Sequence, residues 1–159
     1  MAGRLTRHRS VIGFAIVATL GLLAVGCSSD EGGGSEGGGS VDVTLQEFAV
    51  IPSASSIGAG EVTFEATNEG PNDPHELVVF ATDLAPDALP TREDGGVDEE
   101  GEGVTMIGEI EEFPVGETQS ATFTLDAGSY VLICNLVEEE EGGLESHYLE
   151  GMRVGFTVE

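Results

Sequence analysis

The residues of this chain that are best suited to binding a metal ion are few and fall in a distinctive order. Beyond Gly26 the sequence has two histidines, two methionines, and only one cysteine besides Cys27. Four of these residues follow one another along the chain as His75, Cys134, His147 and Met152. A thiolate and two imidazoles suit copper in both of its common oxidation states, and a thioether adds a weak axial bond. The residue types therefore indicate a site for one copper ion.

Taken singly, each of these residues has a simpler explanation. A lone cysteine is more often packed in a core than bound to a metal, and a lone histidine or methionine usually has a structural role. The combination favours a metal, because otherwise both histidines, the thiol and a nearby methionine would fall in this order by coincidence. Met106 is different, because it lies in the apolar stretch 104–110, where we expect it to be part of the core.

The N-terminal residues have the pattern of an export signal. Arg4, Arg7 and Arg9 precede an apolar run of sixteen residues, 11–26, which is shorter than the roughly 20 that a transmembrane helix needs. The run leads into Leu-Ala-Val-Gly-Cys, which resembles the bacterial lipobox, so we expect Cys27 to be lipidated. An ordinary signal peptide followed by an incidental cysteine is the alternative. The expected location is extracytoplasmic, with the protein lipid-anchored on the periplasmic side or the outer face of the cell membrane.

The remainder of the chain divides into a lipidated, Gly/Ser-rich linker, 27–40, and one domain, 41–159. Beyond Gly26 there are 30 acidic residues against Arg92 and Arg153, which gives a formal charge of −28. Such a charge repels nucleic acid and anionic lipid, so we expect no nucleic-acid binding and membrane contact only through the anchor. It favours a cationic redox partner, or it serves solubility in a saline habitat.

Short runs of β-branched and aromatic residues, separated by Gly, Pro, Asn and Asp, predict an all-β domain. We expect a Greek-key β-sandwich of seven or eight strands, and we place six of them at 43–50, 61–67, 76–81, 119–125, 129–135 and 153–158. The run 130–134 is apolar on both faces, as in a central strand. The segment 85–103 is rich in Pro, Gly and acidic residues, and we expect a long loop that is too polar to bury.

Three segments resemble the cupredoxins, the family of plastocyanin- and azurin-like blue-copper proteins. GEVTFEATNEGPNDPHELVVF is similar to the strand, turn and histidine of that family, and LDAGSYVLICN is similar to the strand that leads to the copper cysteine. SHYLEGMRVGFTVE is similar to the ligand loop and last strand, with the His-x4-Met spacing of the family. The resemblance implies a type 1 copper site with four ligands: His75, Cys134, His147 and Met152. It also implies a one-electron carrier that cycles between Cu(I) and Cu(II), and not an enzyme.

Two features depart from the family pattern. Twelve residues separate Cys134 from His147, where the family usually has a much tighter loop. We expect the acidic stretch 137–145 to bulge into solvent, either as a tolerated insertion or as a docking site for a partner. Glu76 stands where many relatives have Asn or Ser. The sequence therefore does not define the groups that surround the thiolate or the reduction potential.

Within the carrier interpretation, we expect His147 to lie near solvent and to serve as the port for electrons, with Tyr148 and Leu149 forming the adjoining contact surface. Two other functions stay open from the sequence. The protein could store or deliver copper without redox turnover, or it could be a metal-free β-sandwich lipoprotein that binds a protein partner. A visible absorption spectrum with copper distinguishes the metal-free alternative from the other two.

Overall fold

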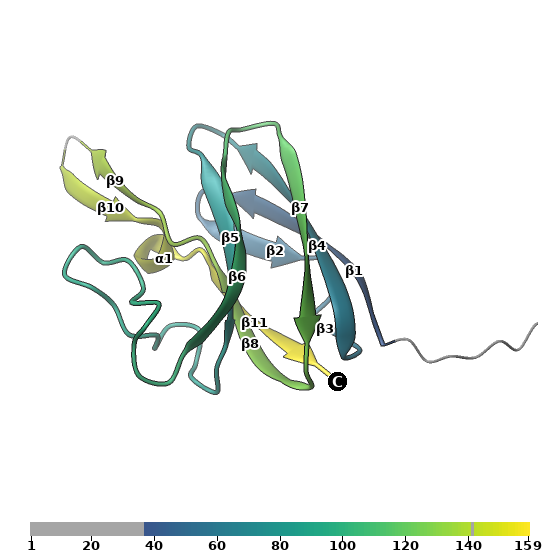
Figure 1. Cartoon of the computed structure of the whole chain (residues 1–159). Coiled ribbons are helices and arrows are strands. Elements are labelled where there is room, and N and C mark those ends of the chain that lie inside the picture. The colour runs from purple at the N-terminus through teal and green to yellow at the C-terminus, as the bar shows by residue number, and fades with distance from the viewer. Residues whose placement is uncertain (1–36, 141) are drawn as a thin grey trace, which may run out of the picture. The chain divides into compact units, whose positions relative to one another are not determined.

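The computed structural model describes residues 37–140 and 142–159, which form two β-sheets, a separate β-hairpin and one turn of helix (Figure 1). Cys27 and the expected signal peptide lie outside these residues. Within the described ranges, no helix has the length and apolar character needed to cross a membrane.

The first sheet has the strand order β2-β1-β4-β7 and contains β1 (Gly38–Gln46), β2 (Ala49–Pro52), β4 (Gly60–Gly70) and β7 (Thr118–Leu125). The second sheet has the order β3-β11-β8-β5-β6 and contains β3 (Ser56–Ile57), β5 (His75–Ala81), β6 (Thr105–Phe113), β8 (Gly128–Ile133) and β11 (Arg153–Val158). β1 runs parallel to β4, and β11 runs parallel to the short β3. The other pairs of the second sheet, β11 with β8, β8 with β5 and β5 with β6, are antiparallel. The predicted all-β sandwich is confirmed.

Several strands differ from the prediction. The single strand expected at 43–50 is two strands, because the chain turns after Gln46 and β2 pairs back onto β1. β6 was not predicted, because two register irregularities against β5 break the alternation of buried and exposed residues along it. The hairpin strands β9 (Val137–Glu140) and β10 (Gly143–Ser146) occupy the acidic stretch that was expected to be a loop.

The central strands β5 and β8 are buried on both faces, as the run 130–134 predicts. Leu77 and Leu132 point between the sheets, into a core that includes Val62 and Phe64 of β4. The alternate residues belong to a second apolar cluster, which contains Val78, Phe80, Val131, Ile133, Leu89, Val97 and Tyr148. Because successive side chains of a strand point to opposite faces, this second cluster covers the outer face of the second sheet.

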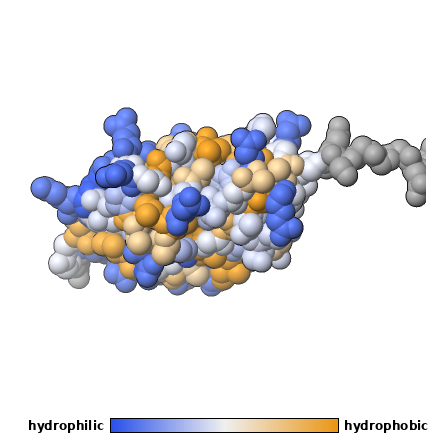
Figure 2. Space-filling model, turned by 90° about the horizontal axis from the view of Figure 1, so that it is seen from below, coloured by the Kyte–Doolittle hydropathy of each residue, from blue (hydrophilic) through white to orange (hydrophobic). Residues whose placement is uncertain are grey.

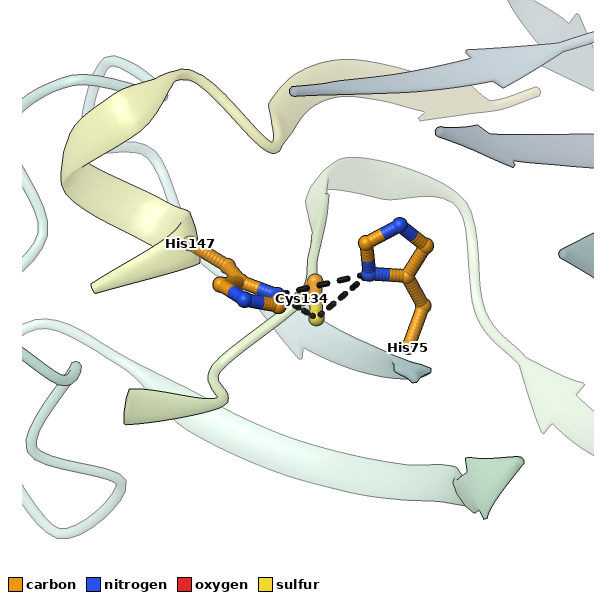
Figure 3. Close-up of side chains that lie close together, drawn as sticks. All are labelled: His75, Cys134 and His147. Atoms are coloured by element: carbon orange, nitrogen blue, oxygen red, sulfur yellow. Dashed lines mark hydrogen bonds between the residues drawn. The ribbon is translucent and has the colours of Figure 1, made fainter. Parts of the chain in front are cut away.

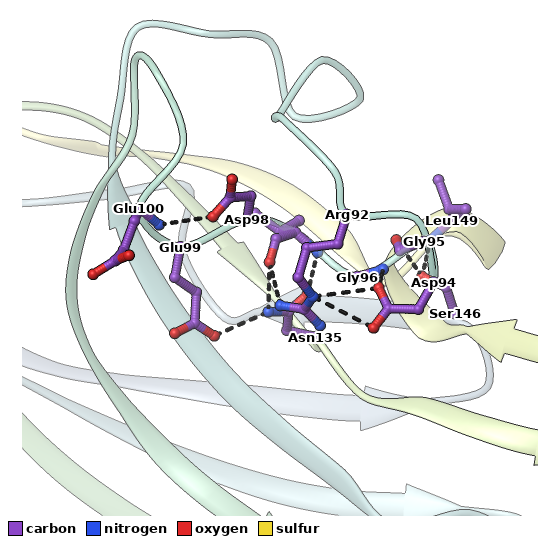
Figure 4. Close-up of polar contacts among 11 residues, drawn as sticks. Arg92, Asp94, Gly95, Gly96, Asp98, Glu99, Glu100, Asn135, Ser146 and Leu149 are labelled. Carbon is purple, nitrogen blue, oxygen red and sulfur yellow. Dashed lines mark hydrogen bonds and ion pairs between the residues drawn. The ribbon is translucent and has the colours of Figure 1, made fainter.

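The long loop between β5 and β6 covers that outer face, so the expectation that this loop is too polar to bury is wrong. Leu89 and Val97 are buried, and Thr91 forms an isolated β-bridge with Val97. The side chain of Asn135, just beyond β8, accepts a hydrogen bond from the Val97 N–H and donates to the Val97 carbonyl (3.2 Å) and to Glu99 Oε1 (3.0 Å) (Figure 4). Two apolar anchors and one buried amide therefore hold the loop in place despite its acidic composition.

Hydrophilic and apolar side chains are interspersed on the face of the molecule shown in Figure 2. Among the described residues, the large apolar side chains that stay exposed are Ile51, Leu84, Val115, Leu144 and Leu149. A few exposed apolar side chains are normal on the surface of a folded domain. Leu144 and Leu149 are notable only for their positions, because they lie in β10 and in the short helix that follows it.

Candidate metal centre

Three side chains from different elements meet at one end of the second sheet (Figure 3). His75 begins β5, Cys134 directly follows β8, and His147 begins the helix α1 (His147–Glu150). His147 Nδ1 lies 3.3 Å from Cys134 Sγ and 3.3 Å from His75 Nδ1, and His75 Nδ1 lies 3.9 Å from the same sulfur. All three residues have 0% of their surface exposed. The fold thus directs one thiol and two ring nitrogens at a common point in the interior.

The spacing of these three atoms fits a single bound ion. Imidazole nitrogen and thiolate sulfur bind d-block ions such as zinc at about 2.0–2.1 Å and 2.3 Å, so trigonal ligands lie roughly 3.5–3.8 Å apart. The distances of 3.3–3.9 Å in this cluster span that range. A mixed set of one sulfur and two nitrogens, without a carboxylate among the three, is the set that copper prefers over magnesium or calcium.

Met152 is fully buried and is tied to the same cluster through its backbone. The Cys134 N–H donates to the Met152 carbonyl (3.1 Å), and the Met152 N–H donates to the His147 carbonyl (2.9 Å). Gly151 between them has φ 134°, a conformation that L side chains rarely adopt, and its N–H caps α1. A Cβ at this position would also lie 3.1 Å from the Phe48 carbonyl oxygen. The tight turn that places Met152 beside His147 and Cys134 therefore requires glycine.

His147 is fully buried, so the expectation that its ring lies near solvent is wrong, whereas its role as the port for electrons stays a prediction. Its ring packs edge-on against Phe48, with 5.4 Å between ring centroids. Tyr148 is also buried, because its hydroxyl accepts from the Leu89 N–H (3.1 Å) and donates to the Pro86 carbonyl (2.9 Å) of the long loop. Only Leu149, which is 55% exposed, belongs to the surface that was expected there.

The acidic hairpin does more than bulge into solvent. Glu138, in β9, places Oε2 3.2 Å from His147 Nε2, on the side of the ring opposite Cys134. Asp73 and Glu145 also gather at His147, since one carboxylate oxygen of each and one ring nitrogen lie within 4.8 Å of one another. No pattern in the sequence points to this contact, because it depends on the register that pairs Glu138 with Glu145.

The loop before His75 is fixed by two residues that the sequence did not single out as functional. Glu47 Oε1 accepts the N–H groups of Asn72 (2.7 Å) and Asp73 (2.6 Å). Asn68 is fully buried and donates through Nδ2 to the Asp73 carbonyl (2.9 Å). Asn68 belongs to the segment that resembles the strand and turn of the family, which is a usable signal, and it lies near the end of β4. Glu47 is distant in sequence, and only the tertiary fold brings it here. Both residues position the backbone that carries His75.

Burial governs the protonation of His75 and Cys134. It holds the pKa of His75 below its ordinary value, and the adjacent His147 lowers it further, so the ring is neutral at pH 7. Burial also raises the pKa of the Cys134 thiol to about 12, although the backbone amides of Glu76 and Leu136 act in the opposite direction. A metal ion must therefore displace a proton from Cys134 but finds a free lone pair on His75.

Glu76, one of the departures from the family pattern, lies against the segment that carries the thiol. Its Oε1 accepts the backbone N–H of Asn135, the residue after Cys134, at 3.0 Å. Burial raises the pKa of Glu76 to about 7, with a further upward contribution from the carboxylates of Glu109, Glu99 and Glu111. Glu76 therefore acts as a hydrogen-bond acceptor that fixes the backbone beside the sulfur.

Comparison with known proteins bears on the fold. No protein-family model matches the chain, and no curated protein matches it in sequence. Among solved structures, it is similar to dithionite-reduced auracyanin from the photosynthetic bacterium Roseiflexus castenholzii, with a TM-score of 0.51 and 18% identity over 76% of this chain and 96% of the other.

Two further structures give the same result. Auracyanin A, described as a "blue" copper protein from Chloroflexus aurantiacus, matches with a TM-score of 0.50 and 20% identity over 77% of this chain and all of the other. The copper protein rusticyanin matches with a TM-score of 0.52 and 17% identity over 77% of this chain and 78% of the other. At such low identity the likeness concerns the fold, and the described residues accordingly form a domain with the cupredoxin fold.

Proposed function

We propose that the protein binds one copper ion at a type 1 site and carries single electrons by cycling between Cu(I) and Cu(II). The observation that carries this proposal is the convergence of one thiol and two imidazole nitrogens, 3.3–3.9 Å apart, in a fully buried position. His75, Cys134 and His147 would hold the ion, and Met152 would supply a weak axial thioether. The copper provides the redox chemistry, and the chain provides the ligands and their rigidity.

The way the ligands are fixed supports electron transfer. A carrier works best when its ligands keep their places as the metal changes charge. His75 is held by the strand β5 and by the anchored loop before it, and Cys134, His147 and Met152 are joined by backbone hydrogen bonds. Because these supports come from both the sheet and the ligand loop, the site resists rearrangement in either oxidation state.

The likeness to auracyanin A and rusticyanin supports copper as the ion, since the descriptions of both structures name copper. We do not propose an enzyme, because every group in the buried cluster is accounted for as a ligand or as a support for one.

We also propose an extracytoplasmic location with a lipid anchor at Cys27, which rests on the lipobox-like sequence. As partner we propose a cationic redox protein, which rests on the charge of −28 beyond Gly26.

The decisive experiment adds one equivalent of Cu(II) to the purified protein and records the visible spectrum. An intense blue or green colour from thiolate-to-copper charge transfer is expected, and Cys134→Ser should abolish it. Met152→Leu should alter the hue and the reduction potential more than the occupancy, because the axial bond is weak. A colourless wild-type complex would refute the type 1 site.

A second measurement separates a carrier from a storage or delivery protein. Cyclic voltammetry of the copper form should give a reversible one-electron wave over many cycles without metal loss. Release of copper to a modest chelator after a single reduction would contradict the carrier and favour delivery.

A further inference from the structure

The hairpin β9–β10 is fastened at its base, next to the candidate metal centre. The His147 N–H donates to the Leu136 carbonyl (3.0 Å), which joins the residues that flank the hairpin. Ser146, the last residue of β10, is buried and donates through its hydroxyl to the Gly95 carbonyl (2.8 Å) of the long loop. Because both ends of the hairpin are held, the position of Glu138 relative to the His147 ring is set by the fold.

The two ring nitrogens of His147 face different partners. Nδ1 lies 3.3 Å from Cys134 Sγ, whereas Nε2 lies 3.2 Å from Glu138 Oε2. When the lone pair of Nδ1 is given to a metal, the ring proton must reside on Nε2, and that nitrogen then donates to the carboxylate. Carboxylate–histidine–metal arrangements of this kind fix the orientation of the ligand ring and increase its basicity.

The other imidazole provides a contrast within the same site. His75 also directs Nδ1 at the sulfur, but its Nε2 is buried and has no hydrogen-bond partner among the described residues. The two histidines therefore differ in their outer contacts although their inner contacts are alike. The carboxylate support is specific to His147 and comes from the long acidic insertion between Cys134 and His147.

The negative charge of the carboxylates near His147 also bears on the copper centre. Glu138 has a side chain that is 32% exposed, and Asp73 and Glu145 are likewise partly buried near the same ring. Negative charge in a partly buried position is screened less than on an open surface. It stabilises Cu(II) more than Cu(I), because the oxidised ion carries one more positive charge. A cluster of carboxylates on one ligand therefore lowers the reduction potential.

We propose that Glu138 is a positioning residue for the metal ligand His147, and that its carboxylate, together with those of Asp73 and Glu145, lowers the reduction potential of the copper centre. This inference rests on the proposed copper function. It gives the acidic insertion 137–145 a role at the metal centre. Neither alternative raised by the sequence, a tolerated insertion or a docking site for a partner, includes such a role.

The test compares Glu138→Gln with Glu139→Gln in the full copper-loaded protein. Both substitutions remove one negative charge from the same strand, but Glu139 is exposed and alternates with Glu138 across the strand. Loss of an outer-shell partner typically weakens metal binding 10- to 100-fold. We expect Glu138→Gln to weaken Cu(II) about tenfold more than Cu(I), which raises the potential by about 59 mV. Glu139→Gln should change the potential much less, and equal shifts for the two variants would overturn the proposal.

A second readout isolates the hydrogen bond from the charge. In the diamagnetic Cu(I) form, the Nε2 proton of His147 should be visible by 15N–1H NMR and should exchange slowly with water. Glu138→Ala should make this proton exchange faster, whereas Glu139→Ala should leave it protected. Unchanged protection in Glu138→Ala, with retained fold by circular dichroism, would also overturn the proposal. A wild-type protein that never turns blue refutes the copper function itself, so the two failures are distinguishable.

Discussion

Asn135 and Glu76 connect the two strands that carry the thiol and the first histidine. The backbone N–H of Asn135 donates to Glu76 Oε1 at 3.0 Å, and each of these residues directly follows a proposed ligand. The same asparagine uses its side chain to hold the long loop at Val97. A single residue therefore links the backbone of the metal centre to the covering loop.

The raised pKa of Glu76 predicts a pH dependence of stability in the metal-free protein. A carboxyl whose pKa rises to about 7 on folding stabilises the fold below its unfolded pKa, near 4.5, and this contribution is lost as the pH rises through 7. Glu76→Gln keeps an acceptor for Asn135 and removes the charge. We expect it to increase the free energy of unfolding at pH 8 by up to about 3 kcal/mol and to have little effect at pH 4.5. Urea unfolding at both values tests this, with Glu112→Gln, an exposed glutamate, as control.

Copper affinity should depend on pH through the thiol of Cys134. Because burial raises its pKa to about 12, the metal-free protein keeps the proton throughout the neutral range, and copper must displace it. The apparent Cu(II) affinity should therefore rise about tenfold for each pH unit between 7 and 9, with about one proton released per ion. Competition titrations and proton-release measurements in weak buffer check the slope. A pH-independent affinity would contradict a buried, protonated thiol.

Replacing Asn135 by Leu should loosen the long loop. The substitution leaves the Val97 backbone N–H without its acceptor, and a buried donor left unsatisfied costs about 1–3 kcal/mol. We expect a loss of about 2 kcal/mol in the free energy of unfolding and faster hydrogen exchange at Val97. Asn72→Leu serves as the control, because Asn72 is exposed. Equal stability of the two variants would show that the loop is held by its apolar anchors alone.

If the hairpin steers a cationic partner, its exposed carboxylates should govern the rate of association. Glu139→Gln combined with Glu140→Gln should lower the on-rate for a lysine-rich redox protein several-fold and flatten its salt dependence. The control combines Glu61→Gln with Glu65→Gln, two exposed positions on β4 in the other sheet. Stopped-flow measurements at two ionic strengths provide the comparison. Identical effects from both pairs would indicate net charge alone and not docking at the hairpin.

The proposed anchor at Cys27 has a direct test in cells. Wild-type protein should partition with membranes and carry lipid, whereas Cys27→Ala should be released or remain unprocessed. Two or more acyl chains are needed for stable attachment, since each buried CH2 contributes only about 0.8 kcal/mol. Mass spectrometry of the mature N-terminus and membrane fractionation give the answer. A wild-type protein that is cleaved elsewhere and recovered entirely in the soluble fraction would refute the anchor.

The features predicted correctly from the sequence are those with a strong local pattern. The strand through 130–133 is apolar on both faces, and it is the central strand β8 with a core on each side. The order of His75, Cys134 and His147 predicted a cluster, and the fold brings their side chains together. In both cases the residue types limit where the segment can lie. A strand that is apolar on both faces must be covered on both faces, and a free cysteine is usually buried.

The features that were missed depend on tertiary contacts. The long loop has only Leu89 and Val97 as buried anchors among many acidic residues, so its composition conceals its packing. The hairpin is rich in glutamate, which disfavours strands, and it forms because β9 and β10 pair with each other next to a fixed base. The burial of His147 was missed because its ring packs against Phe48, which is distant in sequence, and contacts Glu138 of the hairpin.

The complete burial of His75, Cys134 and His147 has a kinetic consequence. An ion bound among these side chains would leave only when the chain that covers them moves, so its residence time would depend on how often the hairpin at His147 opens. Equilibrium affinity and escape rate then become separately adjustable properties. A substitution at the fastened base, such as Ser146→Ala, which removes the contact with Gly95, should shorten the residence time more than it weakens binding.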